Sequence, residues 1–286
     1  MERADFDEFL LGLFLAVEAQ VECLKTSEQH DEWADLDAGL MLKLWQTLTT
    51  IRDLQQPRFL VVQGRRSIEH VDFQSIGALT RMAVENCLVS DWLFGRGEPD
   101  KKELHRMVWK YGGLCSLASA LPTTCDARKA AEDAHRQAEE LQPCIEAGLR
   151  KHYPKINLEK GTGKDVLAGK WMKLAWVAEK AELSGHHKSR FKVIYDQLSG
   201  YAHSNFVSAR QALAATSLAD QQEMAHAISI QLMPVLAHTL RYFIDRCPAA
   251  MRAVGASEFM MLIEGWSELA EHQEMLLRNA WVKPDK

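Results

Sequence analysis

The segment 73–94, FQSIGALTRMAVENCLVSDWLF, constrains the fold more than any other part of the chain. Its composition favours a helix, and apolar side chains occur on nearly every side of that helix. Such a helix is stable in water only when other helices cover it. We find no convincing apolar run of period two elsewhere. The sequence therefore predicts an all-α protein, a bundle of about eight to ten helices around this buried central helix.

The same reasoning divides the rest of the chain into expected helices and breaks. A hydrophobic content of 47% with few Gly and Pro is typical of a helical globular protein. The expected helices cover about 6–25, 33–55, 72–94, 101–120, 126–152, 165–183, 189–210, 220–246 and 257–281. We expect a loop or short extended turn over 58–70, an N-cap at Asp72, and a kink or break at Pro143.

Domain count and location follow from what the sequence lacks. We find no internal repeat and no low-complexity linker, so we expect one domain over 1–286, with a possible seam in the loop 153–164. The apolar run 9–17 follows acidic residues, whereas a secretory signal begins with positive charge. No other stretch approaches the length needed to span a bilayer. The six cysteines contain no Cys-x-x-Cys pair and are expected to be free thiols, so the sequence predicts a cytoplasmic protein without a membrane segment.

Two charged residues stand out within the central helix. Arg81 and Glu85 are one turn apart on a stripe that also carries Val84, Leu88 and Trp92. Buried charges are costly unless they are paired and hydrogen-bonded. One interpretation is an internal ion pair that fixes the packing of the bundle. The other is a polar site inside the bundle, in which groups from a second helix meet this pair.

The stretch from Ser189 to Arg210 is the best source of those groups. Its apolar stripe contains Phe191, Ile194, Tyr195, Leu198 and Ala202, and a polar strip on the other side contains Asp196, Ser199 and His203. The strip is either a solvated helix face or a face covered by a second helix that Gly200 allows to come close. Ser199 and His203 are our candidates for contact with Arg81 and Glu85. A Ser-His-Asp triad is excluded, because its members must converge from separate elements.

The chain contains a basic region near its middle. Residues 150–192 carry eleven Lys and Arg against four Asp and Glu, a net charge of +7 in a protein whose total is −5. Aromatic residues are interleaved with them, as in surfaces that bind phosphates and stack bases. A lysine-rich face that only maintains solubility is the alternative. The candidate ligand-binding residues are Lys164, Lys170, Lys173, Lys188 and Arg190.

Metal and nucleotide motifs are weak. Glu132-x-x-His135 and Glu223-x-x-His226 match the spacing of di-iron bundles, but about one such match is expected by chance in a chain of this composition. The loop 155–165 contains two glycines and a lysine without the strand and the first glycine of a phosphate loop. We therefore predict no metal and no cofactor.

Together, Arg81-x-x-x-Glu85 and the later Tyr195-x-x-Leu198-Ser199-x-x-x-His203 resemble an uncharacterised bacterial family called domain of unknown function 5677. The resemblance covers roughly residues 40–246 and implies an all-helical protein without an assigned activity. A wider similarity is to the helical HEPN proteins, many of which cleave RNA. Those proteins carry an Arg, four to six residues and a His on one helix, whereas this chain has no arginine at that spacing before His203.

Three hypotheses remain open from the sequence. In the first, a non-catalytic protein binds a nucleic acid or other anionic ligand, or a partner, through the polar cluster and the basic region. In the second, a metal-independent ribonuclease uses His203 as general acid and base and Arg81 to stabilise charge on the phosphate. In the third, an enzyme acts on a small molecule with Glu85 as base. The second predicts that Arg81 and His203 lie within reach of each other. Self-association is left open.

Overall fold

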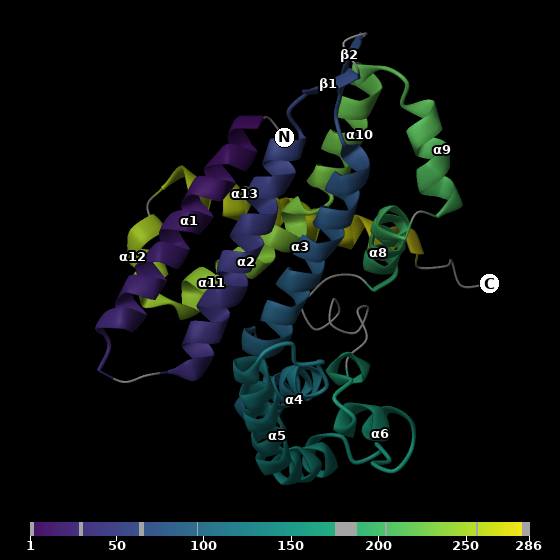
Figure 1. Ribbon diagram of the computed structural model, residues 1–286. Coiled ribbons are helices and arrows are strands. Elements are labelled where there is room, and N and C mark those ends of the chain that lie inside the picture. The colour runs from purple at the N-terminus through teal and green to yellow at the C-terminus, as the bar shows by residue number, and fades with distance from the viewer. Residues whose placement is uncertain are drawn as a thin grey trace, which may run out of the picture. The chain divides into compact units, whose positions relative to one another are not determined.

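The computed structural model describes residues 3–28, 31–62, 66–95, 97–174, 188–203, 205–255 and 257–281 (Figure 1). They belong to two compact units: Met1–Asp91 with Gly185–Lys286, and Trp92–Ser184. The loop 153–164, where we expected a possible seam, lies within the second unit. Apart from one two-stranded sheet, the regular elements of the described residues are helices, so the all-α class is confirmed. The arrangement around a central helix stays a prediction.

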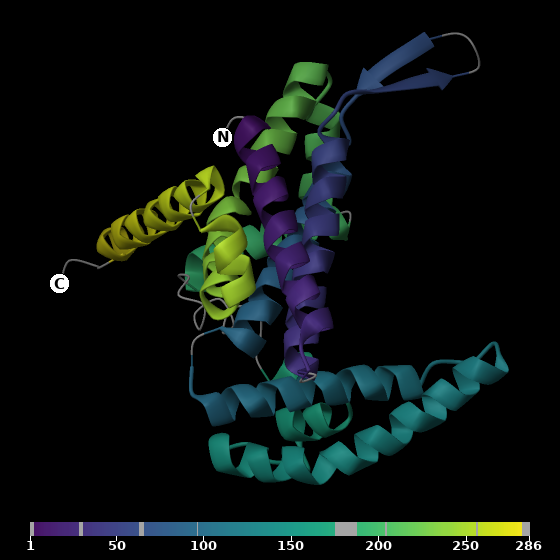
Figure 2. The ribbon, with the colours of Figure 1, turned by 90° about the vertical axis from the view of Figure 1, so that its left-hand side faces the viewer.

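The first unit begins with a pair of long helices. α1 (Arg3–Thr26) and α2 (Glu32–Leu54) pack against each other, and α1 also packs on α12 (Pro248–Val254) and α13 (Glu258–Trp281) (Figures 1 and 2). The Asp31 side chain caps α2 by accepting hydrogen bonds from two backbone amides. Gly12 sets the approach of α1 to α13, because a Cβ there would lie 2.1 Å from Cγ of Phe259.

A hairpin interrupts the helices. β1 (Arg58–Val62) pairs antiparallel with β2 (Arg66–His70), with Arg58 opposite His70 and Val62 opposite Arg66. Figure 2 shows the two strands side by side, as a pair of arrows. The expected short extended turn is thus a sheet, the exception to an all-α chain. Each strand is only five residues long, too short to give a convincing alternating pattern.

α3 (Phe73–Phe94) follows directly and agrees with the predicted helix. The Ser75 amide donates to Asp72 Oδ1 over 3.0 Å, which confirms the predicted N-cap. Ile76, Val84 and Leu88 are at most 1% exposed. Met82 is 48% exposed, so one side of α3 is open rather than covered.

The second unit is built on α4 (Pro99–Ala118) and α5 (Cys125–His152), which pack closely. α5 is continuous through Pro143, so a break there is wrong. α6 (Gly161–Leu167) begins earlier than the expected helix, and a 3₁₀ turn covers Trp171–Lys173. Gly169, with φ of +83°, ends α6, since this left-handed conformation favours glycine. The predicted helix 165–183 is helical at 165–167, within α6, but is wrong from 168 to 174, and its remainder lies outside the described residues.

Two other expected helices are each divided in two. The stretch 189–210 forms α8 (Lys188–Ala202) and α9 (Phe206–Ala214), because Asn205 caps a new helix through Ser208 N. The expected helix 220–246 forms α10 (Leu218–Ile230) and α11 (Met233–Arg246), since Pro234 takes a place in the first turn of α11.

The segment 218–246 is, within the described residues, long and apolar enough to span a membrane, which we did not expect. Of its most apolar window, 61% is buried inside the protein, as in a core helix. Such a single segment is weak support for a membrane protein. A cytoplasmic location stays a prediction.

Candidate functional site

Four polar side chains from three places in the first unit meet in one cluster, which we call the Arg81 cluster. α3 supplies Arg81 and Glu85, α8 supplies Tyr195, and His203 follows the last residue of α8. Arg81 Nη2 donates to Glu85 Oε1 over 3.2 Å and to the Tyr195 hydroxyl over 2.9 Å. The same hydroxyl donates to Glu85 Oε1. Arg81 Nη1 lies 3.2 Å from Nε2 of His203.

The contact with Arg81 defines the state of the imidazole. A guanidinium has only donors, so His203 accepts through Nε2 and carries its hydrogen on Nδ1. Nη1 has two hydrogens, of which this contact uses one. His203 is exposed, so the cluster runs from a half-buried base at Glu85 to the surface. The arrangement thus offers both an imidazole and an arginine donor at its open end.

The pKa values in the cluster follow its hydrogen bonds. Burial lowers the pKa of Arg81, but the hydrogen bond with Tyr195 and the charge of Glu85 raise it, and together they prevail. Burial and the hydrogen bond to Glu85 raise the pKa of Tyr195, against the opposing effect of Arg81. Arginine is therefore charged and tyrosine is protonated at neutral pH, the states in which the three side chains hold each other.

The predicted ion pair is less buried than expected. The side chains of Arg81 and Glu85 are 20% and 31% exposed. Our expectation of a pair enclosed within the bundle is wrong, because α3 is open on the side of Met82. Elsewhere in this unit a carboxylate is more deeply buried: the Asp37 side chain is 6% exposed, and its partner Arg246 is 21% exposed. Arg246 Nε and Nη2 donate to the Asp37 carboxylate over 2.6 and 2.7 Å, and Nη2 also donates to Ser90.

The sequence did not predict the pairing of Asp37 with Arg246. Asp37 and Arg246 are 209 residues apart, and neither stands in a recognisable motif. A carboxylate only 4% exposed that receives both ends of a guanidinium fork is bound strongly and in one orientation. Its place within the core favours a structural role.

A glycine in α3 places Tyr201 of α8 against that helix. A Cβ at Gly77 would lie 2.4 Å from two atoms of the Tyr201 ring. This contact is one turn before Arg81, and Tyr195 lies on the same helix as Tyr201. We had expected Gly200 to permit the approach of a second helix, which is wrong. The side chain of Asn205, the cap of α9, occupies that space instead, 2.5 Å from the position of a Cβ.

The predicted polar strip is only partly used. His203 reaches Arg81, but Asp196 forms an exposed ion pair with Lys192. Ser199 is half-buried, and no side-chain hydrogen bond of its hydroxyl is found within the described part of the chain. Tyr195, which we placed on the apolar stripe, brings its hydroxyl to Glu85, whereas Ala202 of that stripe is exposed. A tyrosine satisfies both assignments, because its ring is apolar and its end is polar.

The chain was compared with known proteins. No family model, curated protein or solved structure matches it. The resemblance to domain of unknown function 5677 and to HEPN proteins therefore stays a prediction.

The basic region is divided between the two units. Lys164, Lys170 and Lys173 are exposed on the second unit, where Lys170 contacts Asp165 over 2.9 Å and lowers the pKa of that carboxyl. The side chains of Lys188 and Arg190, at the start of α8, lie outside the described part of the structure.

Two aromatic side chains of the basic region pack inside the second unit, whereas a surface that stacks bases would need them exposed. Trp171 stacks on Trp92, with ring centroids 5.8 Å apart, and the Tyr153 hydroxyl lies 2.7 Å from Nε2 of the buried His105. They complete the core of the second unit instead of offering faces to bases.

Among the described residues, no three His, Cys, Asp or Glu side chains lie close enough to hold a metal ion. His135 lies near Glu139, 3.5 Å away, rather than pairing with Glu132. All six cysteines are free thiols.

Proposed function

We propose that this protein binds an anionic, phosphate-bearing ligand at the Arg81 cluster, without a metal. The observation that carries the proposal is the contact between Arg81 and His203, which are 122 residues apart and meet at 3.2 Å beside the surface. Glu85 and Tyr195 fix Nη2, so the guanidinium plane is held by two partners before any ligand arrives. A guanidinium held in this way is a pre-organised donor for a phosphate oxygen.

The Arg81 cluster favours a phosphate group over a ligand that carries only diffuse negative charge. Glu85 largely offsets the charge of Arg81, so attraction at long range is small. Recognition then depends on hydrogen-bond geometry, with the second Nη1 hydrogen directed to one oxygen and His203 Nδ1 as a further donor. Lys164 and Lys173 are exposed on the second unit, which by itself offers a separate, salt-dependent attraction for RNA.

RNA cleavage without a metal is the second candidate, and the same contact favours it. A neutral imidazole accepting through Nε2 is a general base for a ribose 2′-hydroxyl once the ligand displaces the arginine hydrogen. Arg81 would then stabilise the charge that develops on the phosphate. We do not propose the small-molecule enzyme with Glu85 as base, because Oε1 of that carboxylate already accepts hydrogen bonds from Arg81 and Tyr195.

One experiment separates these functions. A pool of short labelled RNAs in EDTA is incubated with wild type, His203→Ala and Arg81→Lys, after circular dichroism has shown that each is folded. His226→Ala, which removes an exposed histidine from α10, is the matched control. Binding that both cluster variants weaken, without cleavage, supports the ligand-binding function. Cleavage that His203→Ala abolishes and His226→Ala leaves intact would replace it with the ribonuclease.

The lysines of the second unit are tested separately. The double variant Lys164→Gln, Lys173→Gln should weaken RNA binding and reduce the slope of log Kd against log salt by about one to two. Arg128→Gln with Lys129→Gln removes the same charge from the exposed start of α5 and should leave that slope unchanged. If no variant of either set alters binding, or wild type binds no RNA and no inorganic phosphate, the proposed function is wrong.

A further inference from the structure

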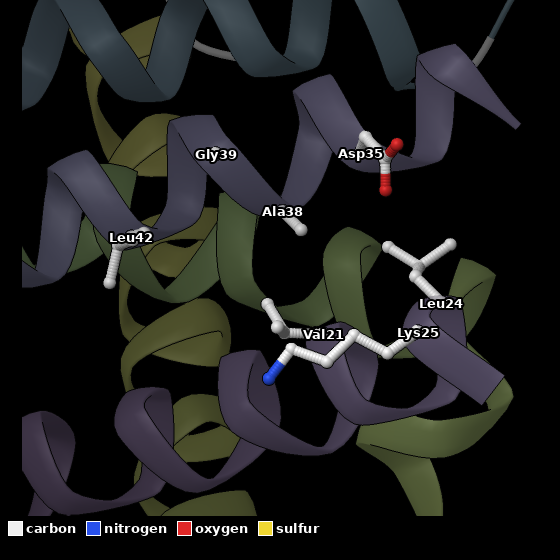
Figure 3. A pocket seen from close by; sticks show the side chains of 7 residues that line it. All are labelled: Val21, Leu24, Lys25, Asp35, Ala38, Gly39 and Leu42. Carbon is white, nitrogen blue, oxygen red and sulfur yellow. The ribbon is translucent and has the colours of Figure 1, made fainter.

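α1 and α2 form a furrow on the first unit, bounded by charged pairs. At one end Asp7 of α1 accepts from Arg52 of α2 over 2.8 Å. At the other end Lys25 of α1 and Asp35 of α2 line a pocket of about 360 Å³. Figure 3 shows side chains of both helices pointing into the space between them, with Val21 and Leu24 on α1 and Ala38 and Leu42 on α2. The two helices thus meet along their length, and the open space between them lies at residues 21–25 of α1 and 35–42 of α2.

Large apolar side chains are exposed along this furrow and on the adjoining side of α1. Leu11 is 53% exposed, Phe14 38%, Leu15 39% and Leu42 39%. Phe14 lies against Trp45 of α2, with ring centroids 5.3 Å apart, which joins the two helices into one apolar surface. Exposed apolar groups that adjoin one another mark binding surfaces more often than isolated ones do.

Gly39 leaves an opening in the wall of the furrow. A Cβ at this position would meet nothing within 4 Å, although Gly39 lies in the middle of α2 and costs helix stability there. The glycine is thus not required for packing within the unit. The space that it leaves in the pocket accommodates an apolar side chain from outside.

The surroundings of this furrow are acidic. Residues 1–54 contain twelve acidic and four basic side chains, a net charge of −8 in a protein whose total is −5. Glu18 and Glu22 are exposed on α1, and Lys25 is neutralised by Glu22 at 2.6 Å. Arg52 is similarly neutralised by Asp7.

These charges decide which occupant fits. Nucleic acid and anionic lipid would be repelled. A second copy docking through the same face would bring two acidic rims together, which costs free energy. A helix with an apolar stripe flanked by Lys and Arg satisfies both the furrow and its rim.

We propose that the furrow between α1 and α2 is a docking site for a cationic amphipathic helix of a partner protein. Apolar side chains of that helix, spaced one turn apart, enter beside Gly39 and against Phe14 and Leu42. Its basic residues lie over Glu18 on α1. This site is independent of the Arg81 cluster.

The test uses a fluorescent synthetic helix with leucines at i, i+3, i+4 and i+7 flanked by lysines, and the same helix flanked by glutamates. Anisotropy measures binding to the full chain. We expect the lysine peptide alone to bind, more weakly at high salt, and about tenfold more weakly to Leu42→Glu. Gly39→Leu places side-chain atoms in the pocket, starting from a Cβ that meets nothing within 4 Å, and should weaken binding while the melting temperature stays equal or rises. The control is Leu121→Glu, the same substitution at a leucine of the second unit that is 93% exposed, against 39% for Leu42.

Three results would overturn the proposal. The first is equal binding of the two peptides, or no binding of either. The second is a loss of affinity in Leu121→Glu as large as in Leu42→Glu. The third is a concentration-dependent dimer, seen in sedimentation of wild type and lost in Leu42→Glu, which would assign the furrow to a second copy of this chain.

Discussion

His105 should make the second unit sensitive to acid. The imidazole is 2% exposed, stacks on Trp92 with ring centroids 4.4 Å apart, and is held at both nitrogens. Nδ1 lies 3.2 Å from the Trp92 carbonyl oxygen and Nε2 lies 2.7 Å from the Tyr153 hydroxyl. Burial, with smaller contributions from Lys102 and Lys101, lowers the pKa of His105 from 6.5 to about 4, against the opposing effect of the Trp92 carbonyl.

The size of the effect follows from proton linkage. Because the folded-state pKa is below the unfolded value, the unfolded chain binds the extra proton first. The stability that the neutral ring contributes is complete above about pH 6.5 and is lost as the pH falls towards 4. A difference of about 2.5 in pKa, at 1.36 kcal/mol for each unit, gives about 3 kcal/mol.

The assay is urea unfolding of the full chain at several pH values between 7 and 4, with hydrogen exchange of α4 and α5 to follow the second unit. His105→Gln removes the titration while keeping a donor and an acceptor, so its stability should fall by about 3 kcal/mol less than that of wild type over this range. His135→Gln, at an exposed position of α5, is the control. If wild type and His105→Gln lose stability in parallel, the ring does not titrate as its burial requires.

Three further predictions concern the first unit and are checked by urea unfolding at pH 7. Glu85→Gln should cost about 1–2 kcal/mol, since its pair is half-buried, and a loss above about 4 would mean that the pair is enclosed after all. Asp37→Asn should cost about 2–3 kcal/mol, because it removes the buried carboxylate that accepts two hydrogen bonds from Arg246, and an unchanged midpoint would contradict the burial of Asp37. Gly77→Ala should lower the free energy of unfolding by about 1–3 kcal/mol, because the new methyl group forces the Tyr201 ring away. Gly39→Ala should raise it by up to about 1 kcal/mol, because its Cβ meets nothing. If Gly77→Ala were the more stable of the two variants, both packing arguments would be wrong.

The sequence predicted helix bounds best where the residues of a single helix mark its apolar face and its ends. The bounds of α1, α2 and α3 agree with the expected ranges to within a few residues, because each has a helical apolar period and a recognisable start or end. Prediction failed at His203–Asn205 and at Gln231–Leu232, where one expected helix becomes two. Both breaks depend on a cap or a proline whose effect is decided by neighbouring packing.

Much the same division holds for the Arg81 cluster. Its residue types were identified from the sequence, since a charged pair on an apolar helix stripe and a polar strip on an amphipathic helix are local patterns. The expected meeting of Arg81 with His203 is found, while Ser199 is not drawn in and Tyr195 takes the central position.

The amino-acid sequence by itself determined the helical class, most helix bounds, and the two segments that carry the cluster, because these depend on interactions within a few residues. Only the tertiary structure decided which side chains meet. The close approach of Gly77 to Tyr201 and the pairing of Asp37 with Arg246 both depend on residues more than 100 positions apart. Contacts of that kind are fixed by how whole helices pack, and no local pattern in one helix specifies its neighbour.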